Sequence, residues 1–207
     1  MIRHLNKLLL KGYMQKAGRP IPKSVSLGLG LILVWLILMR QGSILVLFDM
    51  LIKGDWIAKH ENCAIIGPTG IGKSWLACAL GHKACRDNRS VLYTRLPRLI
   101  EELALAKGDG RIAARMKSLA RVDLLILDDW GLEPLDSNAR HHLLEILEDR
   151  YGRRATLVTS QLPVARWHEL IGDPTYADAI LDRLVHNAHR LEISGESMRR
   201  HTTAIAA

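Results

Sequence analysis

The stretch Gly67-Pro68-Thr69-Gly70-Ile71-Gly72-Lys73-Ser74 decides the fold of this chain of 207 residues. It has the spacing G-x-x-x-x-G-K-[ST], with an apolar run directly before it and a segment of helical composition directly after it. The glycines let backbone N–H groups turn toward phosphate oxygens, Lys73 reaches the β- and γ-phosphates, and Ser74 is a ligand for Mg²⁺. A glycine-rich turn is the alternative, but the strand before and the helix after favour a loop that binds a nucleoside triphosphate.

Apolar strands alternate with helical segments along the rest of the chain. We expect strands at 63–66, 91–94, 122–129, 155–159 and 190–193. Helices are expected at 75–88, 97–106, 111–120, 137–151, 164–171 and 176–189. Residues 124–127 are four consecutive large aliphatics, which indicates burial on both faces, as in a parallel sheet. The pattern predicts an α/β fold of the P-loop NTPase type, a parallel sheet flanked by helices in three layers.

Two carboxylates follow the apolar part of the third strand. Asp128 is placed to hold Mg²⁺ opposite Ser74, and Asp129 is placed to orient the water that attacks the γ-phosphate. Glu133 lies nearby and is the alternative to Asp129. The fourth strand ends in polar residues, of which Ser160 or Gln161 is the candidate for sensing the γ-phosphate.

Arginines near the end of the chain are candidates for stabilising the charge of the transition state. Arg183 follows the expected sensor strand and lies on a late helix, from which it can reach the nucleotide of a neighbouring subunit. Arg199 or Arg200 can reach the nucleotide of the same subunit. The alternative for each is a solvated surface charge.

Charge is unevenly distributed along the chain. The formal net charge is +8, from 29 Lys and Arg against 21 Asp and Glu. Residues 1–60 hold nine of the basic residues and two of the acidic ones, which leaves twenty and nineteen for residues 61–207. The nucleotide-binding part is thus almost neutral. Its three cysteines form no C-x-x-C pair, which favours reduced thiols and a cytoplasmic location.

The first fifty residues differ in character from the rest. Residues 1–17 are a basic amphipathic segment, and residues 25–39 form an uncharged, largely apolar run of fifteen. Such a run resembles a signal peptide or anchor, but as a helix it spans about 22 Å of a hydrocarbon core about 30 Å thick. We therefore do not expect a membrane as a partner.

The quoted loop, DLLILDDWGLEPL, LVTSQLPV and GDPTYADAILDRLVHNAHRLEISGESMRR together resemble the IstB family of insertion-sequence helper ATPases. This AAA+ family is related to the DnaC helicase loaders, and the resemblance covers about residues 50–200. It implies a sheet order of 5-1-4-3-2 with little or no C-terminal lid. It also implies ATP hydrolysis with Mg²⁺, self-assembly on double-stranded DNA and action with a cognate transposase.

Carried over by position, the resemblance assigns Walker A to Gly67–Ser74 and Walker B to Asp128 and Asp129. It assigns the first sensor to Ser160 and Gln161, the intersubunit arginine to Arg183 and the second sensor to Arg199. Two alternatives stay open, namely a helicase loader in replication and an inactive ATP-binding remnant of a transposable element.

The resemblance divides the chain into three regions. Residues 1–50 are an atypical N-terminal region, 51–200 the IstB-like domain and 201–207 a tail. Residues 18–47 do not resemble the charged helical start of the family, and we hypothesise that they are translated out of frame or joined across a deletion. Reading the coding DNA in the other two frames tests this, since neither frame yielding a charged helical stretch would refute it.

Overall fold

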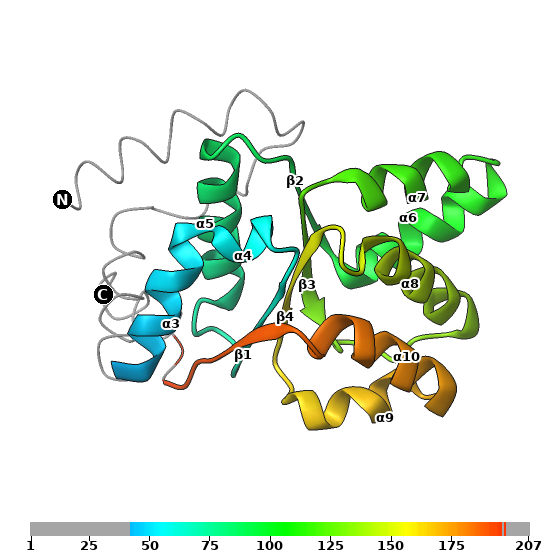
Figure 1. The fold of residues 1–207 in the computed structure, drawn as a ribbon. Helices are drawn as coiled ribbons and strands as arrows, with labels where there is room; N and C mark the ends of the chain where they lie inside the picture. The colour runs from blue at the N-terminus through cyan, green and yellow to red at the C-terminus, as the bar shows by residue number, and fades with distance from the viewer. Residues whose placement is uncertain (1–41, 196, 198–207) are drawn as a thin grey trace, which may run out of the picture.

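The computed structural model describes residues 42–195 and residue 197, and the chain is drawn in Figure 1. The expected helix at 1–17, the apolar run at 25–39 and the tail at 201–207 lie outside these residues. The strands are β1 (Asn62–Ile66), β2 (Val91–Arg95), β3 (Leu124–Trp130), β4 (Ala155–Ser160) and β5 (Ala188–Glu192). The helices are α3 (Gly42–Lys53), α4 (Asp55–Ala58), α5 (Lys73–Arg86), α6 (Leu96–Gly108), α7 (Ile112–Arg121), α8 (Ser137–Arg150), the 3₁₀ turn η1 (Val164–Arg166), α9 (Trp167–Ile171) and α10 (Pro174–Val185).

The strands form one parallel sheet in the order β2-β3-β4-β1-β5, which is the predicted order read from the other edge. Every pairing is parallel, as between β1 and β4, where Ala64 lies opposite Val158. The carboxyl ends of all strands therefore meet at one edge of the sheet, the lower edge in Figure 1. The loop at 67–72 and the two aspartates are brought to this edge by topology alone.

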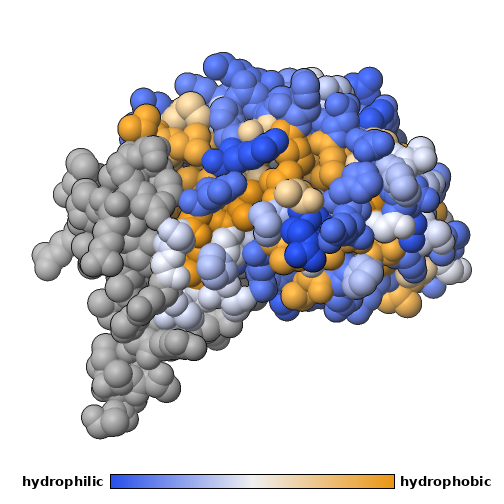
Figure 2. Space-filling model, turned by 90° about the horizontal axis from the view of Figure 1, so that it is seen from below, coloured by the Kyte–Doolittle hydropathy of each residue, from blue (hydrophilic) through white to orange (hydrophobic). Residues whose placement is uncertain are grey.

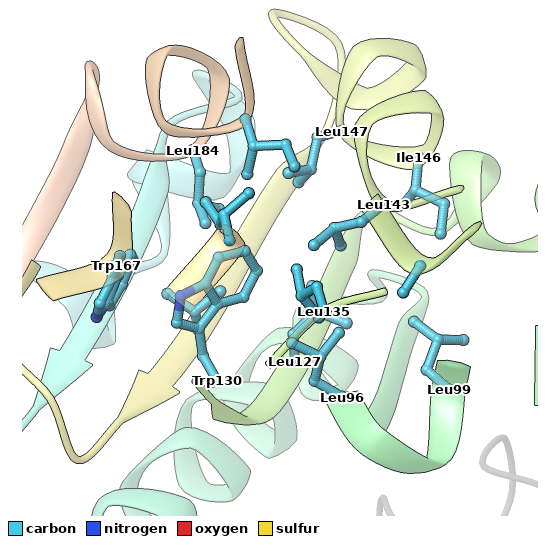
Figure 3. Close-up of a cluster of buried hydrophobic side chains, with 14 of the residues drawn as sticks. Leu96, Leu99, Leu127, Trp130, Leu135, Leu143, Ile146, Leu147, Trp167 and Leu184 are labelled. Atoms are coloured by element: carbon cyan, nitrogen blue, oxygen red, sulfur yellow. The ribbon is translucent and has the colours of Figure 1, made fainter. Parts of the chain in front are cut away.

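Helices cover both faces of the sheet, and each face has its own core. Successive residues of β3 point to opposite faces, so Leu124 and Ile126 pack against α3, α4 and α5, while Leu125 and Leu127 pack toward α6 to α10. Figure 3 shows part of the second core, where the rings of Trp130 and Trp167 lie 5.3 Å apart between centroids. Burial on both faces explains the unbroken aliphatic run of β3.

The end of the chain differs from the sequence-based expectation. The helix expected at 176–189 ends at Val185, and the last strand begins at Ala188 instead of residue 190. Asn62 at the start of β1 causes this, since its amide donates to the carbonyls of Arg183 at 2.9 Å and Leu184 at 3.2 Å. These are carbonyls of the last turn of α10, which have no partner within the helix. A residue far away in sequence thus ends the helix and frees 188–192 to pair with β1.

Helix α3, the first described helix, spans residue 50, where the sequence predicts the boundary between the atypical N-terminal region and the domain that follows. Leu51 on α3 is 1% exposed and belongs to the core beside α5, and its carbonyl accepts a hydrogen bond from the buried indole of Trp56 at 3.0 Å. Residues 51–53 are therefore continuous with the last residues of the atypical region. Within residues 42–195, no helix has the length and apolar character needed to cross a membrane.

Candidate functional site

The loop between β1 and α5 packs closely against the chain that leaves β5. Gly67 has φ +154, and a Cβ built there would lie 2.2 Å from the carbonyl oxygen of Ile193. The same strand end is fastened to the loop by a hydrogen bond from the Ile193 N–H to the Ile66 carbonyl at 2.7 Å. Gly70 has φ +83, and its Cβ would lie 2.1 Å from Oγ of Ser197. Only glycine fits both positions, because of the close approach and the backbone conformation.

Gly67→Ala is therefore expected to disturb the loop and to lower the free energy of unfolding by about 3 kcal/mol, since backbone would have to move aside. Urea unfolding and the binding of a fluorescent ATP analogue measure the two effects. Gly108→Ala is the matched control, because nothing lies within 4 Å of a Cβ there and no positive φ is required. Similar behaviour of the two variants would contradict the tight contact with Ile193.

Lys73 and Ser74 begin α5, directly after Gly72. The ammonium group of Lys73 donates to the carbonyl of Pro68 at 2.7 Å, so it is folded back across the loop, and the residue is 8% exposed. The hydroxyl of Ser74 donates to the carboxylate of Asp128 at 3.0 Å. The predicted pairing of the loop serine with the strand aspartate is therefore present in the fold.

Asp128 is 3% exposed and is surrounded by hydroxyl groups. Besides Ser74, the hydroxyls of Thr159 on β4 and Tyr93 on β2 donate to its carboxylate, the latter at 2.5 Å. Burial, and then the hydrogen bond to Asp128, raise the pKa of Tyr93 far above its usual range, so the phenol stays protonated. Sequence reasoning missed Tyr93 and Thr159, although both lie near carboxyl ends of neighbouring strands.

The side chain of Asp129 has different partners from that of Asp128 because of its backbone conformation. Its φ is +61, in a bulge where the register between β3 and β4 shifts, so its side chain does not follow the alternation of the strand. Its carboxylate receives two N–H groups of Arg95, both at 2.6 Å. The hydrogen bond to Asp129 raises the pKa of Arg95. Arg95, the last residue of β2, is a site residue that the sequence did not single out.

The structure gives the two predicted sensor residues different surroundings. Ser160 is 1% exposed, and its hydroxyl donates to the carbonyl of Trp130 at 2.9 Å and accepts from the N–H of Leu162 at 3.1 Å. Gln161 instead reaches the loop, where its amide oxygen accepts a hydrogen bond from the hydroxyl of Thr69 at 2.6 Å. Gln161 is thus the one of the pair whose side chain contacts the loop, whereas Ser160 accepts the N–H of Gly67 with its backbone carbonyl at 3.1 Å.

Arg183 is not brought to the site of its own chain. It lies in the last turn of α10, beside Asn62, at the edge where the strands begin. Its guanidinium is paired with Glu148 on α8 and donates to the carbonyl of Ala179 at 3.0 Å. The hydrogen bond to Glu148 raises the pKa of Arg183. Glu133 makes no contact with the loop among the interactions of residues 42–195, and Arg199 and Arg200 lie outside the described residues.

The chain resembles solved structures of replication proteins in its fold. It aligns with the DnaC helicase loader at a TM-score of 0.62 and 19% sequence identity, over 74% of this chain and 90% of the other. The alignment with DnaI has a TM-score of 0.60 and 22% identity, over 72% of this chain and 81% of the other. These likenesses confirm the AAA+ type of P-loop fold.

Proteins with similar amino-acid sequences are encoded by insertion sequences. The insertion sequence ATP-binding protein y4uH of Sinorhizobium fredii is 77% identical over 154 residues, which is 74% of this chain and 62% of the relative. The IS21 ATP-binding protein of Pseudomonas aeruginosa is 38% identical over 144 residues, or 70% of this chain and 54% of the relative. The chain spans somewhat more than half the length of these relatives. A family model described as IstB-like ATP binding protein matches residues 46–206, and the chain belongs to that family.

Proposed function

We propose that this protein binds and hydrolyses ATP with Mg²⁺, assembles on double-stranded DNA and acts with the transposase of its insertion sequence. The observation that carries the proposal is the contact of the loop serine Ser74 with the strand carboxylate Asp128, with Lys73 beside them. The names of the relatives support the ATP and insertion-sequence parts. Such chemistry belongs in the cytoplasm, where ATP is available.

Each residue of the site would have a separate role toward a bound nucleotide. Lys73 would leave the Pro68 carbonyl and donate to phosphate oxygens, which are stronger acceptors because they are charged. Asp129, oriented by Arg95, would accept a hydrogen bond from the attacking water and later its proton. Gln161, already in contact with Thr69, would sense the γ-phosphate of a nucleotide bound in the loop.

The Ser74 hydroxyl and the Asp128 carboxylate suit Mg²⁺, which prefers hard oxygen ligands. When bound, the ion would neutralise charge on the phosphate oxygens. Tyr93 and Thr159 would hold the Asp128 carboxylate in a fixed orientation during binding. Asp128 therefore has its rotamer fixed by neighbours on two other strands, which favours a preorganised site.

Arg183 would serve the nucleotide of a neighbouring subunit. Arg183 lies at the edge of the sheet where β1 begins, whereas the phosphate-binding loop follows the end of β1. The length of β1, about 16 Å, therefore separates Arg183 from the loop within one chain. Its partner Glu148 is 57% exposed at the side chain, so the pair lies where a second subunit can approach. An arginine supplied in trans stabilises the charge of the transition state and raises turnover by about 10³-fold or more.

Mixing two inactive variants tests both the activity and its location between subunits. Lys73→Ala removes the phosphate-binding cation but keeps Arg183, and Arg183→Ala does the reverse. Each variant alone is expected to lose ATP hydrolysis stimulated by duplex DNA. Mixed in equal amounts they should regain part of it, because some sites then combine an intact Lys73 with an Arg183 from the other chain. Phosphate release with and without DNA is the measurement.

Arg166→Ala is the control, since that arginine is exposed and, in the part of the chain that the structure describes, its side chain is paired with Glu169 in the next turn. Full activity of Arg183→Ala would refute its role, and a mixture without recovery would refute action in trans. If the wild-type protein hydrolyses no ATP under any condition, the remnant hypothesis gains support.

A helicase loader is the second candidate. The fold similarity to the DnaC helicase loader and to DnaI favours it. The two candidates differ in partner, so co-purification with a transposase or with a replicative helicase of the same cell separates them.

A further inference from the structure

The helix α7 presents a basic face to solvent. The end of this helix lies near the edge of the sheet opposite to the nucleotide site. Its sequence contains Arg115, Lys117 and Arg121 and no acidic residue. Met116 and Leu119 are buried, while Lys117, Ser118 and Arg121 are exposed. Lys117 and Arg121 are one turn apart, so their side chains lie next to each other on this face. In the otherwise neutral domain, this is a local concentration of positive charge.

A shallow, open groove of about 490 Å³ lies on this face, between α7 and the residue before β2. Its lining combines the two cations with small and hydroxyl side chains, and consists of Ser90, Ala114, Lys117, Ser118, Arg121 and Val122. Ser90 and Val122 precede β2 and β3, so the groove lies at the edge where the strands begin, the upper edge in Figure 1.

Two further arginines, Arg89 and Arg154, lie near the groove, and the carboxylate of Asp123 beside it is already paired. Asp123 accepts hydrogen bonds from the N–H and hydroxyl of Ser90 at 2.8 and 2.7 Å and lies 3.7 Å from Arg154. Burial raises the pKa of Asp123, but the bonds from Ser90 and the charges of Arg154 and Arg89 outweigh it, and the pKa is lowered. Among the described residues, neither Lys117 nor Arg121 has a carboxylate within 4 Å. The groove therefore keeps a net positive charge.

A buried arginine adds to this charge from beneath. Arg150 is 1% exposed, and its guanidinium donates to the carbonyls of Leu119 at 2.7 Å and Val122 at 2.9 Å, at the end of α7. The carboxyl end of a helix is normally unfavourable for an anion, because its free carbonyls point outward. Here Arg150 satisfies two of these carbonyls and places a cation beside Val122, which lines the groove.

We infer that this groove binds the sugar–phosphate backbone of double-stranded DNA. The inference rests on the proposed function and locates one DNA contact in it. Lys, Arg and Ser are the side chains that contact phosphate oxygens in complexes with DNA. The residues that line the groove include no aromatic ring on which an unpaired base could stack, so a duplex fits better than a single strand. Because no base edge is read, this contact is independent of sequence.

The test compares binding of duplex DNA by the full chain with that of the double variant Lys117→Gln, Arg121→Gln. Each lost phosphate contact lowers the slope of log K against log salt by about 1, so the slope should fall by about 2. At a salt concentration of about 0.1 M the affinity should fall by about tenfold, equally for duplexes of unrelated sequence. Binding of a fluorescent ATP analogue should not change, since the groove lies at the opposite edge from Lys73.

The matched control removes the same charge elsewhere, with Arg98→Gln and Arg166→Gln, two arginines whose side chains are each 60% exposed. The inference is overturned if this control loses as much affinity, if the groove variant binds duplex as the wild type does, or if its loss is confined to single strands. A wild-type protein that binds no duplex DNA at all would instead refute the DNA part of the proposed function.

Discussion

Asp129→Asn is expected to lower the rate of ATP hydrolysis by about three orders of magnitude, while ATP binding stays within a few fold of the wild type. The carboxylate would act on the attacking water, and general-base catalysis of this kind contributes roughly 10²- to 10⁴-fold. Asparagine keeps the size of the side chain but cannot take a proton. Because Lys73 donates to Pro68 and Ser74 to Asp128, while the carboxylate of Asp129 is paired with Arg95, the phosphate-binding part of the site should remain intact.

Single-turnover hydrolysis and equilibrium binding of an ATP analogue separate the two effects. Asp178→Asn is the control, since the Asp178 side chain is 80% exposed and lies on α10, away from the loop. Unchanged hydrolysis in Asp129→Asn would exclude this residue as the base, and Glu133 would then be the next to replace. A loss of binding equal to the loss of turnover would mean that Asp129 supports the loop and not the water.

Arg150→Met is expected to lower the free energy of unfolding by about 4 kcal/mol, more than Gly67→Ala. The guanidinium donates to the carbonyls of Leu119 and Val122, to that of Ala155 and to the hydroxyl of Thr156. Methionine retains the packing of the stem but leaves these groups buried without a donor, and each unsatisfied group costs about 1 to 3 kcal/mol. The partners are mostly backbone carbonyls, which the substitution cannot remove.

Urea unfolding measures this effect, with Arg153→Met as the control because Arg153 is exposed three residues further on. Arg150→Lys should recover only part of the loss, since one ammonium cannot satisfy four acceptors in the directions of the planar guanidinium. Burial lowers the pKa of Arg150 to about 10, so the group is still charged at neutral pH and the comparison can be made there. A change below about 1 kcal/mol would mean that water replaces the lost donor.

Motif spacing along the chain predicted that Ser74 and Asp128 lie together, and they do so in the structure. The loop at 67–74 needs glycines, a lysine and a serine at fixed distances, and the order of strands and helices then places Asp128 opposite Ser74. Parallel strands must end at one edge, so this contact follows from topology. The same reasoning could not choose between Ser160 and Gln161, because adjacent residues point in different directions and only packing decides which reaches Thr69.

The residues that the sequence did not reveal are those whose roles depend on neighbours from other strands. Tyr93 and Arg95 read as ordinary members of a strand, yet they contact Asp128 and Asp129 because β2 pairs with β3 in one register. Arg150 reads as a surface charge near the end of a helix, but it is buried under three other segments. Such contacts join residues many positions apart, so no local pattern predicts them.

The sequence by itself determined the parallel α/β fold, the sheet order implied by the family resemblance and the loop, serine and aspartate of the nucleotide site. The fold class and the loop depend on hydrophobic periodicity and on motif spacing, both of which are properties of short segments, whereas the sheet order follows from the family resemblance alone. The tertiary structure alone decided where α10 ends, which side chains orient the two aspartates, and that the scattered cations of α7 and its neighbours meet around one groove. Pairing register and packing between distant segments produce these features, and neither is encoded in any one stretch of the chain.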